Sequence, residues 1–396
     1  GNLHAEKMKQ LFKLLLFSSL LSLSLSASIA SLADLKKQVI DGKVPSRGVN
    51  LGGWLVAEKW MTGGSPAWNG VPDDVANRGE YSAMKYLGHD KGDKQFDDHR
   101  RTFITEQDFK EISEAGMNTV RLPVGYWIVG FDHSWGSDID SWKTYAPGGL
   151  DYLDKAIREW GPAHNVLVLI SFHAAKGSQN GNDNSSPENP GQANWFAYKE
   201  NVNNSLDAVE FLAKRYKDEA AFLGIGLLNE PQKDASDIPV LQQYYEDAYG
   251  RIRYNVGSDC LLSIMPMLWQ QKPYDGNWAT FMTEPNFYNM RHEWHHYHVW
   301  GFEADKWTPD KIITWINSVE TKYYDEWKGN WLFVGEWSIA SNFNMDDATL
   351  KRFANAQLNM FKKAVGGWTY WAWRYYDNTQ SEWSMKAMLQ RGMLQW

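Results

Sequence analysis

Short apolar runs alternate along the chain with longer stretches in which apolar residues recur at helical spacing. The runs predict strands, and the periodic stretches predict amphipathic helices between them. The predicted strands cover residues 48–51, 118–123, 166–173, 222–230, 260–265, 293–297, 331–336 and 368–373, and the predicted helices 106–115, 150–160, 206–216, 240–254, 309–327 and 346–364. Nearly continuous apolar strands belong to a parallel sheet that is covered on both sides. Eight such alternations predict an α/β fold, the (β/α)8 TIM barrel.

A long connection, residues 56–105, interrupts this rhythm after the first predicted strand. Loops of such length inside a domain usually carry function, and in this fold the insertion belongs to the face that bears the active site. We therefore expect this insertion, which carries Trp60, Trp68 and Tyr81, to wall off one end of a cleft. A doubly wound open sheet is the alternative fold, but no glycine-rich phosphate loop follows the first strand.

The first 33 residues stand apart from the predicted barrel. From Met8 onward the chain has a basic start, a Leu- and Ser-rich middle and a small-residue exit, the pattern of a secretory signal peptide. Residues 1–7 precede that pattern as extra sequence, and the apolar part is too short to span a bilayer. The sequence thus predicts a leader over 1–33, a single domain over 34–396, and secretion to the extracellular space or a cell wall. Asn184 and Asn203 begin N-glycosylation sequons.

Composition narrows the class of partner. The net charge of −8 provides no basic face for nucleic acid. The lone cysteine, Cys260, excludes intrachain disulfides and lies in an apolar run typical of a buried, inert thiol. The chain is unusually aromatic, with 22 Trp, 19 Tyr and 17 Phe. Since buried Trp needs a partner for its N–H, this abundance favours a partly wet, sugar-binding cleft.

Several predicted strands end in polar residues, where the active site of this fold is built. These residues are Arg121, His173, Asn229, Glu230, His295, Tyr297 and Glu336. Two glutamates facing each other without a set of metal ligands indicate glycoside hydrolysis. A metal site that combines His295 with His292, His296 or His298 is the alternative, but only alternate residues of a strand share a face.

Five motifs resemble one family of enzymes. Leu227-Leu-Asn229-Glu230-Pro231 and Gly335-Glu336-Trp337-Ser338 are similar to the acid/base and nucleophile strands of glycoside hydrolase family 5. Asn50-Leu-Gly-Gly-Trp-Leu-Val-Ala-Glu58, Ser178-Gln-Asn-Gly181 and His295-His-Tyr297 resemble its fungal exo-β-1,3-glucanase branch. The resemblance implies that Glu230 is the acid/base and Glu336 the nucleophile. An ionised nucleophile needs donors, for which Arg121 and Tyr297 are the candidates.

The same resemblance implies how the sugar is held. Asn229 would bind the 2-OH, and His173 and His295 would position hydroxyls and carboxylates. Trp371 would form the platform under the sugar, and Glu58 and Asp183 would hold the terminal glucose. At the entrance Trp300 matches one aromatic of a clamp, but Asn182 stands where the fungal enzymes carry phenylalanine. We expect Asn184 to stay unglycosylated, because a glycan beside Asp183 would block the pocket.

The sequence therefore predicts a retaining, exo-acting glucan 1,3-β-glucosidase that needs no cofactor or metal. Its partner would be a β-glucan polysaccharide or oligosaccharide, and the chain would be a monomer that binds neither nucleic acid nor membrane. An endo-acting β-1,4-glucanase or mannanase is an alternative that needs an open cleft. A non-catalytic carbohydrate-binding protein is another, which the presence of both glutamates disfavours.

Overall fold

The computed structural model describes residues 2–136, 138–376 and 381–396, and within them eight parallel strands close into a barrel in sequence order. The strands are β1 (Ser46–Asn50), β2 (Thr119–Gly125), β3 (Leu167–Ala174), β4 (Phe222–Gly226), β5 (Leu261–Ile264), β6 (Met290–His298), β7 (Leu332–Ser341) and β8 (Gly367–Tyr370). β8 pairs with β1 and closes the ring. The predicted TIM barrel is confirmed.

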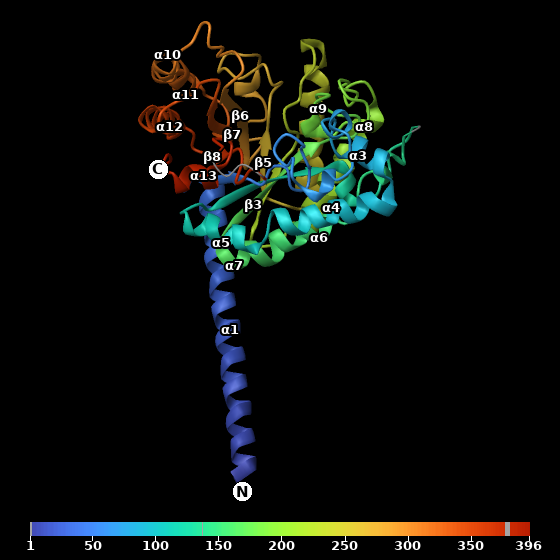
Figure 1. Ribbon diagram of the computed structural model, residues 1–396, viewed down its shortest axis with the longest axis vertical. Helices are drawn as coiled ribbons and strands as arrows, with labels where there is room; N and C mark the ends of the chain where they lie inside the picture. Colours follow the sequence, from blue (N-terminus) through green and yellow to red (C-terminus); the bar gives the residue numbers. More distant parts are fainter. Residues whose placement is uncertain (1, 137, 377–380) are drawn as a thin grey trace.

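Helices surround the strands (Figure 1). They are α1 (Asn2–Ile40), α2 (Asp73–Ala76), α3 (Glu80–Leu87), α4 (His89–Phe103), α5 (Glu106–Glu114), α6 (Gly149–Asp154), α7 (Gly161–His164), α8 (Lys199–Tyr216), α9 (Ile238–Gly250), α10 (Pro309–Trp315), α11 (Thr321–Glu326), α12 (Asp347–Phe361) and α13 (Met385–Gln390). Single π-helical turns continue α6, α9 and α10. The predicted helix 309–327 is thus one amphipathic unit with a π-turn inside it.

Residues of β3, β4, β5 and β7 contribute to two different cores. On β3, Val168, Ile170 and Phe172 belong to the main hydrophobic cluster shared with the helices. Leu167 and Leu169 belong to a separate cluster inside the lower end of the barrel. This division follows from the period of two along a strand. It explains why the strand sequences are apolar on both faces.

The end of α1 closes the bottom of the barrel. Figure 1 shows α1 projecting from the body of the molecule, with only its last turns against the strands. Leu32 and Val39 pack with barrel residues and are almost wholly buried, and the Arg291 guanidinium donates to the Val39 and Ile40 carbonyls at 2.9 and 2.8 Å. Leu32 lies within the predicted leader, and the division of the chain at residue 33 stays a prediction.

The insertion after β1 is more regular than a loop. It contains α2, α3 and α4, with a small core of its own that includes Trp68 and Phe96. The sequence pattern missed α4 because few of its residues are apolar, and because its buried face includes His99 and Arg100. A buried ion pair of 3.0 Å joins Arg100 to Glu80 of α3 and fixes the two helices together.

Two further observations concern the cysteine and the helices. Cys260 is buried, as its apolar surroundings predict. None of the helices in the part of the chain that the structure describes combines the length and the apolar character needed to cross a bilayer.

Candidate active site

A pocket of about 920 Å³ opens at the carboxyl ends of the strands, a volume typical of small-molecule sites. Its walls hold most of the residues that the sequence singled out, namely Glu58, His173, Asp183, Glu230, His295, Tyr297, Trp300, Glu336 and Trp371. Arg121 and Asn229 lie beneath the floor and hold the residues above them. The structure therefore brings all the predicted site residues together.

Glu230 leaves the line of its strand to reach the pocket. β4 ends at Gly226, and Glu230 has a φ of 44°, in the left-handed region that is uncommon for residues other than glycine. Its Oε1 accepts from His295 Nδ1 at 2.7 Å, and its Oε2 accepts from Asn184 Nδ2 at 2.9 Å. The carboxyl group is thus held from two sides.

Glu336 lies on β7 and is 5 % exposed. Its Oε1 accepts from Arg121 Nη1 at 3.0 Å and its Oε2 from the Tyr297 hydroxyl at 2.7 Å, the two donors that the sequence predicts. Burial raises the pKa of Glu336 above its ordinary value, with repulsion from Glu230 adding to it, while His295 and Arg121 act in the opposite direction. The donors favour a carboxylate that is free to attack.

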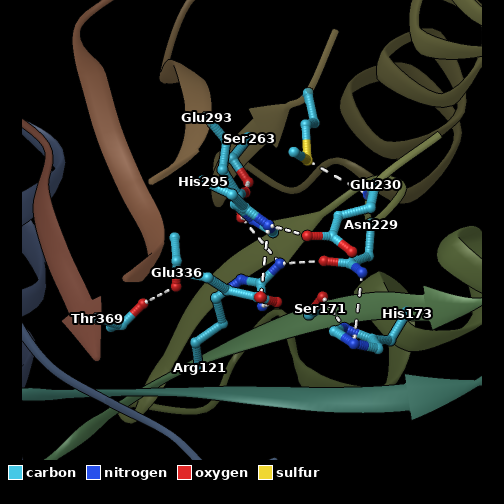
Figure 2. Close-up of polar contacts among 12 residues, drawn as sticks. Arg121, Ser171, His173, Asn229, Glu230, Ser263, Glu293, His295, Glu336 and Thr369 are labelled. Atoms are coloured by element: carbon cyan, nitrogen blue, oxygen red, sulfur yellow. Dashed lines mark hydrogen bonds and ion pairs between the residues drawn. The ribbon is translucent and has the colours of Figure 1, made fainter. Parts of the chain in front are cut away.

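The two carboxyl groups are close together. Figure 2 shows Glu230 and Glu336 on either side of His295. One oxygen of each, together with a nitrogen of that histidine, lies within 4.8 Å of the others. Inverting glycosidases keep their carboxyl groups about 6.5–9.5 Å apart to admit a water, whereas retaining enzymes keep them about 5–5.5 Å apart. The observed spacing suits direct attack by one of the carboxylates.

Arg121 orders the floor below the glutamates. Its Nη2 donates to the Asn229 Oδ1 at 2.7 Å, and its Nη1 also donates to the Asn50 Oδ1 at 2.9 Å. The Asn229 carbonyl is therefore occupied, and its Nδ2 points toward His173, whose Nε2 is 3.4 Å away. The Asn229 side chain is thus fixed with its oxygen on Arg121 and its amide nitrogen toward His173.

His173 and Trp371 form a flat wall. Their rings are stacked, with centroids 5.6 Å apart and planes at 10°. Burial lowers the pKa of His173 well below its ordinary value, and the nearby charges of Arg121 and His295 add to the effect. His173 is therefore neutral, and the wall can meet the apolar face of a sugar ring.

Two acids line the pocket beside this wall. Glu58 is 3 % exposed, and its Oε2 accepts from Trp60 Nε1 at 2.7 Å. Its Oε1 is buried and has no hydrogen-bond partner among the described residues. Burial raises the pKa of Glu58 well above its ordinary value, with Asp183 the next cause, and burial raises that of Asp183 too. Both acids have oxygens available to a hydroxylated ligand.

The rim is aromatic but incomplete. Trp300 is 69 % exposed and meets Tyr297 edge-on, with ring centroids 5.6 Å apart. Trp383 continues the surface toward Trp60, at 5.3 Å between centroids. Asn182 is exposed on the lining, where it offers no ring.

The insertion contributes less to the wall than expected. Trp60 and Asn77 line the pocket. Trp68 is buried in the core of the insertion and packs on Phe96 at 5.7 Å between centroids. Tyr81 lines a different hollow and packs against the main hydrophobic cluster. The insertion therefore meets the pocket through Glu58, Trp60 and Asn77.

Several site residues carried no signal in the sequence reasoning. Glu293, Gln271 and Trp383 belong to this group. The Gln271 Oε1 accepts from the His295 backbone N–H at 2.8 Å, and Glu293 accepts from the His295 ring. The apolar run ahead of Glu230 marked that residue, whereas Glu293 and Trp383 directly follow polar residues.

The histidines close to His295 in sequence lie elsewhere. His298 contacts Glu320 at 2.7 Å, and His292 stacks on Trp327. Among the described residues a single cluster has the spacing of metal ligands, and it is formed by Glu230, His295 and Glu336 themselves. Their polar atoms already pair with one another, with Arg121 and with Tyr297.

Comparison with known proteins places the chain. The family described as Cellulase (glycosyl hydrolase family 5) matches residues 88–377. The chain is 31% identical to "Probable glucan 1,3-beta-glucosidase A" of Emericella nidulans, over 95% of this chain and 94% of that one. It is 28% identical to "Glucan 1,3-beta-glucosidase" of Schwanniomyces occidentalis, over 87% and 86%. Its fold is similar to that of rutinosidase from Aspergillus niger, with a TM-score of 0.72 at 19% identity over 89% and 98%.

Proposed function

The chain belongs to glycosyl hydrolase family 5, and we propose that it is a secreted retaining hydrolase that releases glucose from the non-reducing ends of β-1,3-glucan. The observation that carries the proposal is the close pair of Glu230 and Glu336 in a pocket that also holds Glu58 and Asp183. The names of the two relatives, which match along nearly all of their length, support the same substrate.

In the first step Glu336 is the nucleophile. Its carboxylate attacks the anomeric carbon while Glu230 gives its proton to the leaving oxygen, so that the glycosidic bond breaks and a glycosyl ester forms. Arg121 and Tyr297 hold the Glu336 oxygens at 3.0 and 2.7 Å and fix the direction of attack. The Asn229 amide donates to the 2-OH, a contact that strengthens in the oxocarbenium-like transition state.

In the second step the roles of Glu230 reverse. Its carboxylate takes a proton from water, the hydroxide attacks the anomeric carbon, and Glu336 leaves as a carboxylate. Two inversions give net retention. Asn184 and His295 keep the Glu230 oxygens in place at 2.9 and 2.7 Å throughout.

The exo mode rests on the acids beside the stacked wall. The unpaired Oε1 of Glu58 and the partly exposed Asp183 accept hydroxyl protons of a terminal glucose. Further glucose units beyond that position would meet buried carboxyl groups, which cost free energy when they lose polar partners. Chain ends are therefore the preferred substrate. An endo-acting glucanase or mannanase would bind sugar units on both sides of the cleavage point.

Three related expectations follow for the mature protein. The Asn184 amide lines the pocket and donates to Glu230, so a glycan there would abolish access, and we infer that this sequon is unmodified. Secretion follows from the leader pattern at residues 1–33. We infer a monomer, because the pocket is complete within one chain.

A product profile tests the proposal. The purified chain is incubated with laminarin, lichenan, cellulose and mannan, and early products are separated by chromatography. Glucose as the first and main product from laminarin is the expected result. Mixed oligosaccharides without glucose, or faster release from cellulose or mannan, would favour the endo-acting alternative. Sugar binding without any product would indicate a carbohydrate-binding protein.

A further inference from the structure

A third glutamate lies at the centre of the site and outside the pocket lining. Glu293 of β6 is 2 % exposed. Its Oε1 is 2.8 Å from Arg121 Nη2 and 3.0 Å from His295 Nε2, and its Oε2 accepts from the Ser263 hydroxyl at 2.6 Å. Figure 2 shows these four side chains in one network beside Glu230 and Glu336.

The neighbouring strand leaves room for this carboxylate. Gly335 directly precedes Glu336, and a Cβ at Gly335 would lie 1.9 Å from the Glu293 Oε1. Such a contact is impossible without displacement of the carboxylate. The glycine in the nucleophile motif is therefore explained by Glu293, which occupies the space beside the β7 backbone.

Both ring nitrogens of His295 face carboxylate oxygens. Nδ1 is 2.7 Å from the Glu230 Oε1 and 3.5 Å from the Glu336 Oε2, while Nε2 is 3.0 Å from the Glu293 Oε1. A neutral imidazole has only one N–H, so whenever Glu230 is ionised one bare nitrogen would face an oxygen lone pair. The arrangement is satisfied when His295 is a cation with an N–H on each side.

The charges in the site agree with this assignment. Burial opposes ionisation of both groups, yet the charge of Arg121 and the His295 hydrogen bond lower the pKa of Glu293 to about 2. Against the same burial, the charge of Glu336 and the hydrogen bonds with Glu230 and Glu293 raise the pKa of His295 to about 9. The other titratable groups around this pair are His173 of β3, Tyr245 of α9, and His292, His296 and Tyr297 of β6.

We propose that Glu293 is a positioning residue whose fixed negative charge keeps His295 doubly protonated, so that one cationic N–H serves both reacting carboxylates. The inference rests on the proposed roles of Glu230 and Glu336. During the first step negative charge leaves Glu336 and appears on Glu230. The Nδ1–H lies between these groups and stabilises the charge at either place, while His295 itself neither gains nor loses a proton.

The test separates charge from structure with three variants. Glu293→Gln removes the charge and keeps the length of the side chain, and Glu293→Asp keeps the charge on a shorter side chain. Glu320→Gln is the matched control, because Glu320 also contacts a β6 histidine, His298, at 2.7 Å without touching the reacting groups. For each variant the pH dependence of kcat and kcat/KM on an aryl β-glucoside is measured, together with the thermal midpoint.

Glu293→Gln is expected to move the alkaline limb of the kcat profile to lower pH by about one unit or more, since an opposite charge at contact distance shifts a pKa by about that much. We expect kcat to fall about 10- to 100-fold with little change in KM. Glu293→Asp and Glu320→Gln should keep the wild-type alkaline limb. An unmoved limb in Glu293→Gln overturns the inference.

Two further outcomes distinguish a failure of this inference from a failure of the proposed function. If Glu293→Gln does not fold, a wild-type alkaline limb in Glu293→Asp supports the inference, and a limb displaced by a full unit in that variant contradicts it. If the wild-type chain releases no sugar from any β-glucoside, the proposed function has failed instead. Activity on glucosides with unmoved limbs in all the variants would count against Glu293 alone.

Discussion

The two ends of the barrel interior use the same strands for opposite purposes. Along β3, Leu167 and Leu169 belong to the apolar cluster at the lower end, and Ser171 and His173, two and four positions further on, belong to the polar network at the upper end. β7 changes in the same way from Phe333 to Glu336. A step of two positions along β3, and of three along β7, thus separates the apolar core from the polar site.

The two ends of the barrel are stabilised by different interactions. Apolar burial at the lower end stabilises the fold at about 25 cal/mol per Å². Charges at the upper end are costly unless they are paired, and there Arg121 contacts both Glu293 and Glu336. We therefore expect substitutions at the upper end to lower mainly kcat, and substitutions at the lower end to lower mainly the free energy of unfolding.

Glu336→Ala is expected to give the largest effect. Without the nucleophile no glycosyl ester can form, and kcat should fall by a factor on the order of 10⁵ or more. The thermal midpoint should fall little, because the variant also removes a buried carboxyl group. Activity on an aryl glucoside and a melting curve measure the two quantities. Substantial remaining turnover would contradict the assignment of this residue.

Glu230→Ala should cost less and depend on the substrate. Loss of the acid/base should lower kcat about 10²- to 10⁴-fold on laminarin, and less on aryl glucosides whose leaving groups need no proton. Azide should restore the second step and yield a β-glycosyl azide. The same assay on Glu336→Ala is the control, in which azide can only attack the substrate directly and give the α-glycosyl azide. An α-glycosyl azide from Glu230→Ala, or a β-glycosyl azide from Glu336→Ala, would show that the two roles are reversed.

Phe333→Ala examines the lower end. The side chain is 2 % exposed in the apolar cluster, and its truncation should lower the free energy of unfolding by about 3–5 kcal/mol. The kcat of the folded variant should equal that of the wild type. Urea unfolding and the aryl glucoside assay test both statements, with Tyr198→Ala as an exposed aromatic control. A loss of kcat without a loss of stability in Phe333→Ala would contradict the separate roles of the two ends.

Asn182→Phe should give the smallest effect, at the rim. A ring opposite the exposed Trp300 would add a stacking surface worth about 1 kcal/mol, which corresponds to a KM for laminarin about fivefold lower. Short aryl glucosides do not reach the rim, and their KM should stay unchanged. Trp300→Ala is the matched variant and should shift the laminarin KM upward. Equal laminarin KM values for the wild type, Asn182→Phe and Trp300→Ala would show that the rim does not contribute to substrate binding.

The sequence was sufficient to predict the barrel and the proximity of Glu230 to Glu336. Strands such as β3 are apolar on both faces, which marks them in the sequence. Glu336 lies within β7 and Glu230 follows the end of β4, and each belongs to a motif that comes after an apolar run. Strand bounds were less predictable. β4 ends at Gly226 rather than at the predicted residue 230, because the backbone turns to bring Glu230 into the pocket.

What the sequence missed depends on contacts between distant segments. Glu293 acquires its place from Arg121, Ser263 and Gly335, which lie on three other strands, and no local pattern marks it. Trp68 packs in the core of the insertion, and the polar sequence of α4 concealed the helix that provides this core. Tertiary packing decided both cases.

The stereochemistry of the first released glucose decides between retention and inversion, and therefore whether Glu336 acts as a nucleophile. Proton NMR of an early laminarin digest, recorded before mutarotation, distinguishes the two anomers of released glucose. Attack by Glu336 followed by water gives two inversions, so the account predicts that β-glucose appears first and that the α-anomer follows only as mutarotation proceeds. The appearance of α-glucose as the first product would contradict the double displacement and the pairing of Glu230 with Glu336.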